Sequence, residues 1–328
     1  MRLETSRGVF LVRPYAPGDE ELICRGFARA FGKALSPDFW RWKYRGSPAG
    51  FAAVLCFAPD GRLAVHYAGQ FQPVRFFGER LLALHLCDAF THPAFRFAVG
   101  GRQSLFARVA RIFWRTYLKG APFTEYDPLE AAPKKADFVW GLPGYRHFRL
   151  GEITLGYGHQ RPALYAEATA FKKKHPGRFS LSRRPPFPPE EVPVPEEGFL
   201  PCTIIKDAAW FTWRYLKHPA APYLFFGRRE LGLLVLRREE GFFTVVDFLA
   251  RDPVALWELL SGLRRAGLPG RLRVWLSSAS PAAGVFLAAG FKERPEPLGI
   301  VPALRGFFPE AGLLAERFSW VMGDADLY

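Results

Sequence analysis

The sequence predicts a mixed α/β protein that contains two similar domains. The chain has 328 residues, of which 49% are hydrophobic, and this is more than one hydrophobic core usually fills. A short aromatic motif occurs once in each half of the chain. The same order of strand-like and helix-like runs follows each copy, which favours one mixed unit used twice.

The repeated motif reads FWRWKYRGSPA at Phe39–Ala49 and WFTWRYLKHPA at Trp210–Ala220. When Trp42 is aligned with Trp213, the tryptophan, a cationic residue, the tyrosine, the proline and the alanine coincide. A match of this kind that includes tryptophan indicates duplication. Because the tryptophans recur in both halves, we interpret them as core residues rather than as platforms that stack on a base or sugar.

The elements are predicted from apolar runs bounded by turn and cap residues. In each half, strands come first and then alternate with helices, so we expect a mostly antiparallel, twisted central sheet flanked by helices. In the first half the predicted strands are 51–57, 63–71, 81–90 and 138–142, and the helices are 104–118 and 145–151. In the second half the predicted strands are 223–227, 232–237, 243–249 and 272–277, and the helices are 254–265 and 281–290.

A proline-rich stretch divides the halves. The run RRPPFPPEEVPVP begins at Arg183 and can continue neither a helix nor a central strand, so it predicts a stiff, extended linker. The predicted domains are therefore 1–182 and 201–328, joined by a linker over 183–200.

The charge is distributed unevenly. Residues 1–182 contain 27 Lys and Arg against 14 Asp and Glu, whereas residues 183–328 contain 18 against 17. A basic half attracts anions, whether a nucleotide, a nucleic acid or an acidic substrate. Solubility alone would not predict this asymmetry.

The remaining composition indicates compartment and source. The four cysteines are far apart and form no CxxC pair, so we expect buried free thiols and no metal site.

Neither a signal peptide nor an apolar run long enough to span a bilayer is found, which predicts a soluble, cytoplasmic protein without membrane contact. The absence of asparagine is typical of a thermophile or a GC-rich genome.

Three segments carry a resemblance to a known family. They are LVRPYAPGDEE at 11–21, CDAFTHPAFR at 87–96, and SPAAGVFLAAGFK at 280–292. In this order they resemble the start, the central strand and the final helix of the GNAT (GCN5-related) N-acetyltransferase superfamily, in its tandem-domain type. The resemblance implies two GNAT-like domains and a direct attack of a primary amine on acetyl-CoA. It leaves the acceptor open among an amino sugar, a peptide amine and a small metabolite.

The resemblance places the acyl-CoA site at the end of the 81–90 strand. There a loop leads into a helix N-terminus, whose free N–H groups and dipole suit a pyrophosphate. Valine stands at position 99, where the family's loop has its first glycine, and the loop is a few residues longer. The predicted cofactor-binding residues are Ala89, Phe90, Thr91, Arg96, Val99, Gly100, Gly101, Arg102, Gln103 and Ser104.

The second half lacks such a loop. Asp252 precedes a proline at the start of the predicted helix, and this carboxylate suits an N-cap. An acidic cap occupies the N–H groups that a phosphate needs. We therefore expect a degenerate cofactor loop in the second domain.

Two residues are candidates for proton transfer under the resemblance. Asp88 lies in an otherwise apolar strand, where partial desolvation raises a carboxylate's affinity for a proton, and it is the candidate base. The alternative is that Asp88 pairs with an arginine or caps a loop. Tyr145 is the candidate proton donor to the departing thiolate, and the alternative is an ordinary amphipathic tyrosine.

Two other classes of function remain open from the sequence. A chain whose altered loop no longer holds CoA would be a non-catalytic binding or scaffold protein. A chain that used its basic N-terminal half on RNA would be an RNA-binding protein. The sequence does not separate a monomer from a homodimer.

Overall fold

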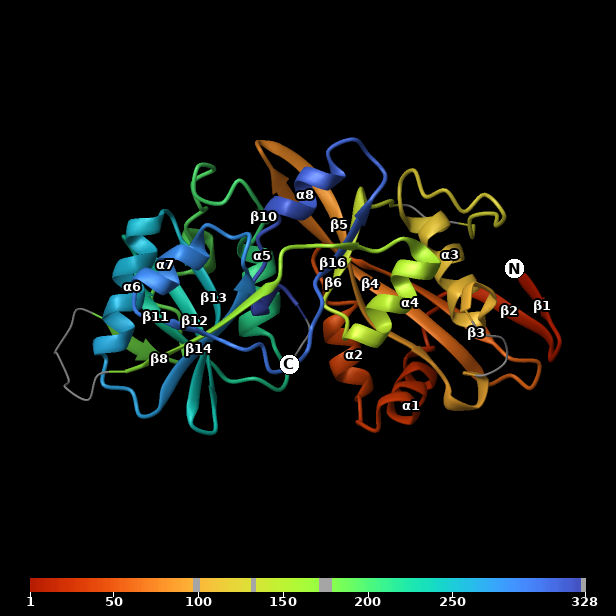
Figure 1. The fold of residues 1–328 in the computed structure, drawn as a ribbon. Coiled ribbons are helices and arrows are strands. Elements are labelled where there is room, and N and C mark those ends of the chain that lie inside the picture. Colours follow the sequence, from red (N-terminus) through yellow and green to blue (C-terminus); the bar gives the residue numbers. More distant parts are fainter. Residues whose placement is uncertain (97–100, 131–133, 171–178, 326–328) are drawn as a thin grey trace. The chain divides into compact units, whose positions relative to one another are not determined.

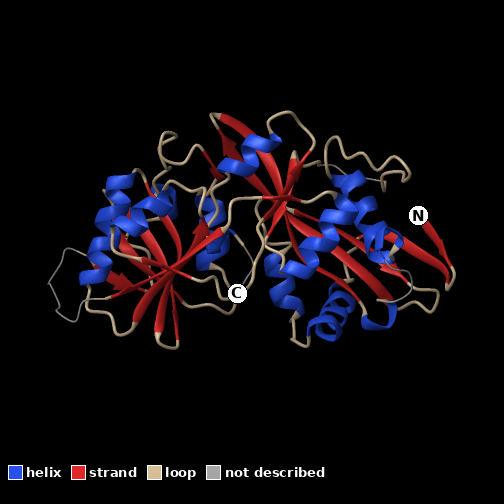
Figure 2. Cartoon of the chain, viewed as in Figure 1, coloured by secondary structure: helices blue, strands red, loops and turns tan. Residues whose placement is uncertain are grey.

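The computed structural model describes residues 1–96, 101–130, 134–170 and 179–325 (Figure 1). The chain forms two compact units. Unit 1 comprises residues 1–73, 81–159 and 302–312, and unit 2 comprises 74–80, 160–301 and 313–328. In each unit, helices flank a sheet (Figure 2), which confirms the predicted mixed α/β class.

The sheet of unit 1 begins as an antiparallel meander of β1, β2, β3 and β4. Strand β5 follows β4, pairs in parallel with β6, and β6 pairs antiparallel with β16. The elements are β1 (Arg2–Thr5), β2 (Gly8–Pro14), α1 (Glu20–Phe31), α2 (Pro37–Lys43), β3 (Phe51–Phe57), β4 (Leu63–Phe76), β5 (Glu79–Thr91), η1 (Pro93–Phe95), η2 (Gly101–Gln103), α3 (Leu105–Tyr117), β6 (Phe138–Gly141), α4 (Tyr145–Leu155), β7 (Gly158–His159) and β16 (Ala303–Gly306).

The sheet of unit 2 has the order β15-β8-β14-β13-β12-β11-β9, and the only parallel pair among its registered strands in the described ranges joins β13 to β14. A separate strand, β10, pairs with the end of β4, whose residues 74–76 belong to this unit. The elements are β8 (Ala163–Thr169), β9 (Ser180–Ser182), η3 (Pro189–Glu191), β10 (Cys202–Ile204), α5 (Ala208–Phe211), η4 (Thr212–Leu216), β11 (Tyr223–Arg228), β12 (Gly232–Glu239), β13 (Phe242–Ala250), α6 (Pro253–Arg265), β14 (Arg271–Ser277), α7 (Ala282–Ala288), β15 (Lys292–Arg294), α8 (Ala311–Arg317) and η5 (Met322–Asp324).

The two units share one order of elements. In unit 1, α2 is followed by β3, β4, β5, α3, β6 and α4, and in unit 2, α5 with η4 is followed by β11, β12, β13, α6, β14 and α7. Each unit thus has three strands, a helix, and a strand parallel to the third. The predicted strand at 63–71 is longer in the structure, because the chain turns only at Phe77 and Gly78, which both have positive φ.

The compact units do not follow the predicted domain ranges. Strand β8 precedes the proline-rich stretch in the sequence but pairs along its whole length with β14 of unit 2. Strand β16 lies near the C-terminus but pairs with β6 of unit 1. Sheet pairing therefore assigns residues on both sides of 183–200 to unit 2, and the domain ranges stay a prediction.

Each unit has a hydrophobic core of its own. In unit 1 the core includes Trp40 and Tyr44 of the repeated motif, both fully buried. In unit 2 the matching segment buries Trp210 and Trp213, whereas Trp42 of unit 1 is half-buried. The four cysteines are buried and free.

Two features are absent from the residues that the structure describes. No helix in these ranges is both long and apolar enough to cross a membrane. No group of three or more His, Cys, Asp or Glu side chains among them is placed to hold a metal ion.

Candidate functional site

Strands β5 and β6 of unit 1 separate part-way along their length. They pair in parallel only over Ala83–His85 and Phe138–Trp140. Strand β6 ends at Gly141, whereas β5 continues to Thr91. The main-chain groups at the end of β5 are therefore not paired with β6, and the end of this strand is the usual place for a ligand in a parallel pair.

Asp88 interrupts the regular strand at this point. Its φ is +51°, a left-handed value that is rare for a residue with a side chain. The carboxylate is held by the Lys43 ammonium at 2.7 Å and by the Tyr44 hydroxyl at 2.8 Å, both through Oδ2. Such a conformation costs about 1 to 3 kcal/mol and persists only where its surroundings fix it. Both partners come from the repeated motif.

His66 holds the main chain of Asp88 from the neighbouring strand β4. Its Nδ1 lies 2.9 Å from the carbonyl oxygen of Asp88, and its ring stacks on Phe90. Burial lowers the pKa of His66, so the ring is neutral near pH 7 and donates through Nδ1. This bond fixes the peptide that joins Asp88 to Ala89.

A cavity of about 340 Å³ opens beside this distorted strand. Its wall combines the end of β5, the start of α3, the end of α1 and one face of α4. Aromatic and aliphatic side chains alternate there with a few polar groups, as in sites for small organic ligands. The lining residues are Phe31, Ala89, Phe90, Thr91, Arg96, Gly101, Ser104, Phe106, His147 and Leu150.

The N-terminus of α3 faces this cavity. Ser104 is the N-cap, and its hydroxyl accepts from the N–H of Ala107 at 3.2 Å. The cap is uncharged, so the positive end of the helix dipole is not neutralised by a carboxylate. Gly101 has φ +62°, and a Cβ there would meet nothing within 4 Å. This geometry leaves room for an anionic group close to the backbone.

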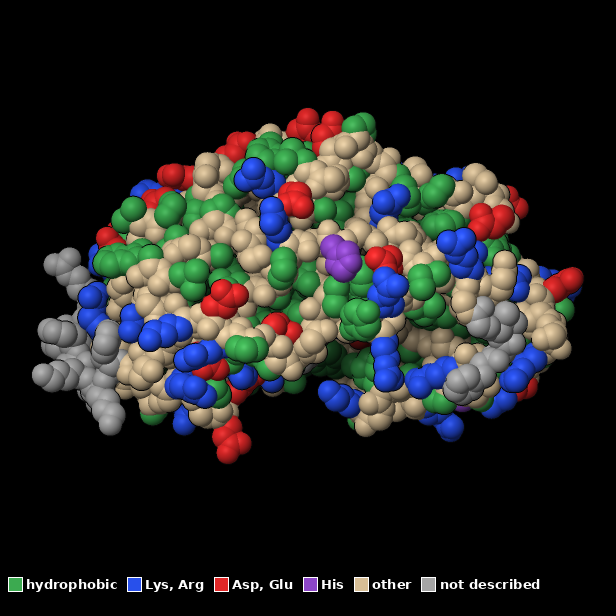
Figure 3. All heavy atoms as spheres, in the orientation of Figure 1, with side chains coloured by type: hydrophobic (Ala, Val, Ile, Leu, Met, Phe, Trp, Pro, Cys, Tyr) green, Lys and Arg blue, Asp and Glu red, His purple; other side chains and the backbone are tan. Residues whose placement is uncertain are grey.

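The electrostatic field at the cavity is positive. Arg96 hydrogen bonds to the carbonyl oxygens of Thr91 and Ala30, and no ion pair found among the described residues includes it. The pKa of His92 is lowered, first by burial and then by the cations Arg29, Arg62 and Arg96. Figure 3 shows Lys and Arg side chains outnumbering Asp and Glu around α4 of unit 1. This field favours an anionic ligand.

The corresponding place in unit 2 is built differently. Helix α6 has Asp252 as its N-cap, and the carboxylate accepts from the N–H of Ala255 at 2.8 Å. Strands β13 and β14 also separate, after Val245 and Val274. Leu276 of β14 pairs with β8 on one side of the strand, and on the other side it forms a β-bridge with Val321. The segment 319–325 thus enters the gap that the separating strands leave.

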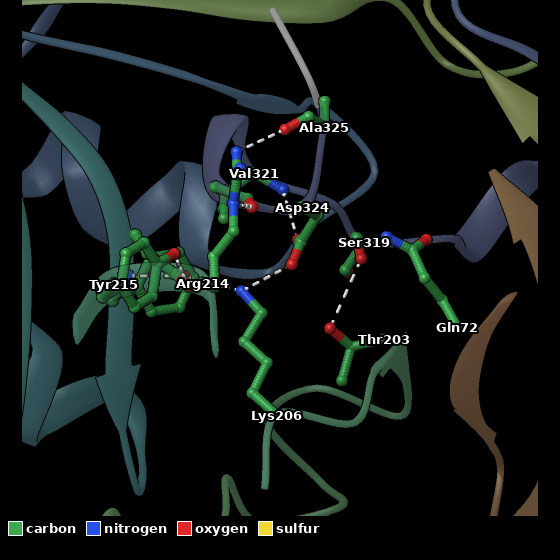
Figure 4. Close-up of polar contacts among 12 residues, drawn as sticks. Gln72, Thr203, Lys206, Arg214, Tyr215, Ser319, Val321, Asp324 and Ala325 are labelled. Atoms are coloured by element: carbon green, nitrogen blue, oxygen red, sulfur yellow. Dashed lines mark hydrogen bonds and ion pairs between the residues drawn. The ribbon is translucent and has the colours of Figure 1, made fainter. Parts of the chain in front are cut away.

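A buried ion cluster fixes that segment. Lys206 Nζ lies 2.6 Å from Asp247 of β13 and 2.9 Å from Asp324 (Figure 4). The Tyr215 hydroxyl donates to Asp247 at 2.6 Å, as Tyr44 does to Asp88 in unit 1. Burial raises the pKa of Asp324 to about 6. In unit 2 the chain's own C-terminal segment occupies the space at the strand ends.

Comparison with known proteins shows which solved structures share this fold. The sequence matches no family model and no curated protein. Among solved structures, a probable N-acyltransferase of Enterococcus faecalis is 12% identical, with a TM-score of 0.61, over 90% of this chain and 72% of that one. A GCN5-related N-acetyltransferase of Kribbella flavida is 11% identical, with a TM-score of 0.61, over 92% and 72%. The N-myristoyltransferase of Saccharomyces cerevisiae with bound myristoyl-CoA is 8% identical, with a TM-score of 0.54, over 93% and 84%.

The chain has the fold of the GCN5-related N-acetyltransferases. The resemblance inferred from three short sequence segments is confirmed at the level of the fold. The likeness extends over both units, since each of these neighbours covers at least 90% of the chain.

Within this fold, six of the predicted cofactor-binding residues line the cavity: Ala89, Phe90, Thr91, Arg96, Gly101 and Ser104. Arg102 and Gln103 lie in the exposed turn η2, where Arg102 donates to the carbonyl of Ile153. Val99 and Gly100 lie outside the described residues.

The two predicted catalytic residues are placed differently. Asp88 directly precedes the lining residues of β5, and its side chain contacts α2 and Tyr44. Its partner is a lysine and not an arginine. Tyr145 is the first residue of α4 and is 65% exposed.

Sequence reasoning missed the groups that come from distant elements. Phe31, Phe106, His147 and Leu150 line the cavity without a motif to mark them. The contacts of Lys43 and Tyr44 with Asp88 had a signal, because a cation, a tyrosine and a strand aspartate recur together in the second half.

Proposed function

We propose that the chain is an acyl-CoA-dependent N-acyltransferase whose single acyl-CoA site is the cavity of unit 1. The observation that carries this proposal is the cavity itself, which lies where two parallel strands separate and which faces the positive end of α3, where the cap Ser104 carries no charge. We also infer that the two units are tandem copies of one ancestral unit, from their shared element order and repeated Tyr–Asp contact.

The residues at the cavity fit a pyrophosphate. The start of α3 offers backbone N–H groups, Ser104 adds no charge, and Arg96 has no carboxylate partner among the described residues. The apolar side chains of Phe90, Phe106 and Leu150 suit the uncharged arm of such a molecule. When bound, acyl-CoA supplies the acyl group as an activated thioester, and an acetyl group is the proposed one.

The proposed chemistry at the reacting end uses Asp88. An incoming primary amine arrives as an ammonium and must lose a proton before it attacks. Lys43 and Tyr44 both bind Oδ2 of Asp88, so Oδ1 is left to accept that proton. The bond from His66 fixes the peptide between Asp88 and Ala89, whose N–H can polarise a carbonyl. Tyr145 is the proposed proton donor to the departing thiolate.

The test exchanges the two helix caps. Ser104→Asp keeps a good N-cap but places a carboxylate where the pyrophosphate would bind, so its affinity for acetyl-CoA should fall about a hundredfold or more by charge repulsion. Asp252→Ser makes the reverse exchange in unit 2 and is the matched control. It should bind acetyl-CoA as the parent does. The measurement is calorimetric titration at one salt concentration.

The proposal fails if the parent binds no acetyl-CoA at millimolar concentration, or if Ser104→Asp binds as tightly as the parent. Transfer is then assayed with amino-sugar, peptide and small primary amines, by the appearance of free CoA thiol. Tight binding without transfer to any of them would support a non-catalytic role instead.

A further inference from the structure

A second cavity, of about 240 Å³, lies within unit 2 and has no part in the acyl-CoA site. Most of its wall is apolar and includes Phe248 and Leu249 at the end of β13. Val321 of the C-terminal segment completes this wall. A concave, mostly apolar space with a few polar groups is the usual form of a small-molecule site.

A row of polar side chains crosses one wall of this cavity. Arg75 of β4 is opposite Thr203 of β10, and Thr203 is opposite Ser319 in the next strand-like segment. Residues directly opposite one another in a sheet point to the same face, so the three side chains share one face. Figure 4 shows Thr203 beside Ser319, and its hydroxyl donates to the Ser319 carbonyl at 3.3 Å.

Two members of the row have hydrogen-bonding atoms that are buried and unused. Ser319 is 3% exposed, and its hydroxyl has no partner among the described residues. The Nε of half-buried Arg75 is also buried without a partner there, and the guanidinium otherwise donates to the carbonyl of Leu200. Leaving such groups unpaired is costly. A ligand with acceptor atoms would satisfy both.

Lys206 and Asp207, which also line the cavity, have partners of their own. Lys206 is held between Asp247 and Asp324, so that cation has its own carboxylates. Asp207 accepts from the N–H of Trp210 as a helix cap. None of the ion pairs found among the described residues includes Arg75 or Arg80. Arg80 is exposed to solvent, whereas Arg75 is half-buried, so Arg75 is the cation for which a bound anion matters more.

We propose that this cavity binds a small amphipathic carboxylate. The guanidinium of Arg75 receives the carboxylate, because a guanidinium fork matches the two oxygens of that group. The hydroxyl of Ser319 donates to an oxygen of the ligand. The hydrocarbon part packs against Phe248, Leu249 and Val321. No acyl transfer is involved, so this site stands apart from the proposed function.

The first experiment varies only the head group of the ligand. Octanoate, octanol and octylamine have the same chain and are titrated separately into the full-length protein without acyl-CoA, by calorimetry. Octanoate should bind saturably at one site. Octanol should bind at least tenfold more weakly, because it offers Arg75 no charge, and octylamine should not bind.

The second experiment locates the site. Val194 lines the cavity and is 73% exposed, so Val194→Trp should block the entrance without disturbing the core. Its matched control is Val254→Trp, at a position on α6 that is 66% exposed and not among the lining residues. Arg75→Met is paired with Arg238→Met, which changes an exposed arginine of β12. Octanoate affinity should fall at least tenfold in the first member of each pair and stay unchanged in the second.

Three results would overturn the proposal: no saturable octanoate binding, equal affinity for octanoate and octanol, or unchanged affinity in both Val194→Trp and Arg75→Met. The head-group series uses the unaltered protein, so it decides the matter even if Arg75→Met unfolds. Because acyl-CoA is absent throughout, failure here and failure of the proposed function are distinguishable.

Discussion

The two units use one scaffold in two ways. In each, a tyrosine of the repeated motif donates to an aspartate on the third strand, and that strand then separates from a parallel partner. In unit 1 the helix that follows has a neutral cap, and a cavity lies beside it. In unit 2 the cap is Asp252, and the segment 319–325 enters the gap. If the proposed function holds, this difference implies that the cap charge and the occupant of the gap, rather than the sheet, decide where an anionic ligand binds.

The largest effect is expected when the two strand aspartates are compared. Asp88→Asn should lower kcat for acyl transfer by roughly a hundredfold to ten-thousandfold, because the amide cannot accept the amine's proton. Acetyl-CoA affinity should change little, since the proposed contact of Asp88 is with the acceptor amine and not with the cofactor. The measurement is steady-state kinetics with a primary amine.

The equivalent change in unit 2 is Asp247→Asn. It removes a carboxylate that Lys206 and Tyr215 share, so it should lower stability and leave the kcat of the folded fraction unaltered. A kcat unchanged in Asp88→Asn would show that this aspartate only pairs with Lys43.

The second prediction concerns how the stability of the protein depends on pH. In unit 2, the carboxylates of Asp247 and Asp324 both pair with Lys206. The pKa of Asp324 is raised to about 6 in the folded protein, against 3.8 unfolded. The folded state therefore binds this proton more tightly, and the stabilisation is present below pH 4 and lost as pH rises through 6. The loss from this group should be roughly 2 to 3 kcal/mol.

Asp324→Asn removes the titrating group. The change in urea-unfolding free energy between pH 4 and pH 7 should therefore differ between parent and variant by that amount, with the variant losing less. An identical pH dependence in the two proteins would mean that Asp324 does not carry a raised pKa.

A smaller effect is expected at His66, which has no role in proton transfer and acts through the main chain. His66→Leu removes the bond to the Asp88 carbonyl, so kcat should fall about tenfold, the value of one ordinary hydrogen bond. His66→Gln can donate again and should recover part of the rate. If the two variants were equally slow, packing rather than the hydrogen bond would explain the loss.

The smallest effect is expected at Tyr145. Tyr145→Phe should lower kcat by tenfold at most, less than general-acid catalysis usually contributes, because a thiolate is already a stable leaving group near neutral pH. Acetyl-CoA affinity should not change. Unaltered kcat would identify Tyr145 as an ordinary exposed residue of α4.

Much of the fold could be predicted because its signals are local. The strand Phe51–Phe57 was placed to the residue from its apolar run, and Asp252 marked a helix start by its capping chemistry. The cavity wall at the end of β5 could be predicted for a similar reason. It follows one continuous segment, from strand to turn to helix.

What escaped prediction depends on residues that are far apart in the sequence. Lys43 meets Asp88 only because α2 packs on the sheet, and the φ of +51° at Asp88 has no sequence signature. The assignment of β8 to unit 2 rests on pairing with β14, more than a hundred residues later. The position of Val321 beside Leu276 likewise depends on the path that the C-terminal segment takes through the fold.

Hydrogen exchange with saturating acetyl-CoA tests the comparison of the two units most directly. The amides at the start of α3, residues 104–108, should exchange more slowly with the ligand bound, and those at the start of α6, residues 252–256, should be unaffected. Protection at α6, or none at α3, would contradict the claim that unit 1 alone holds acyl-CoA.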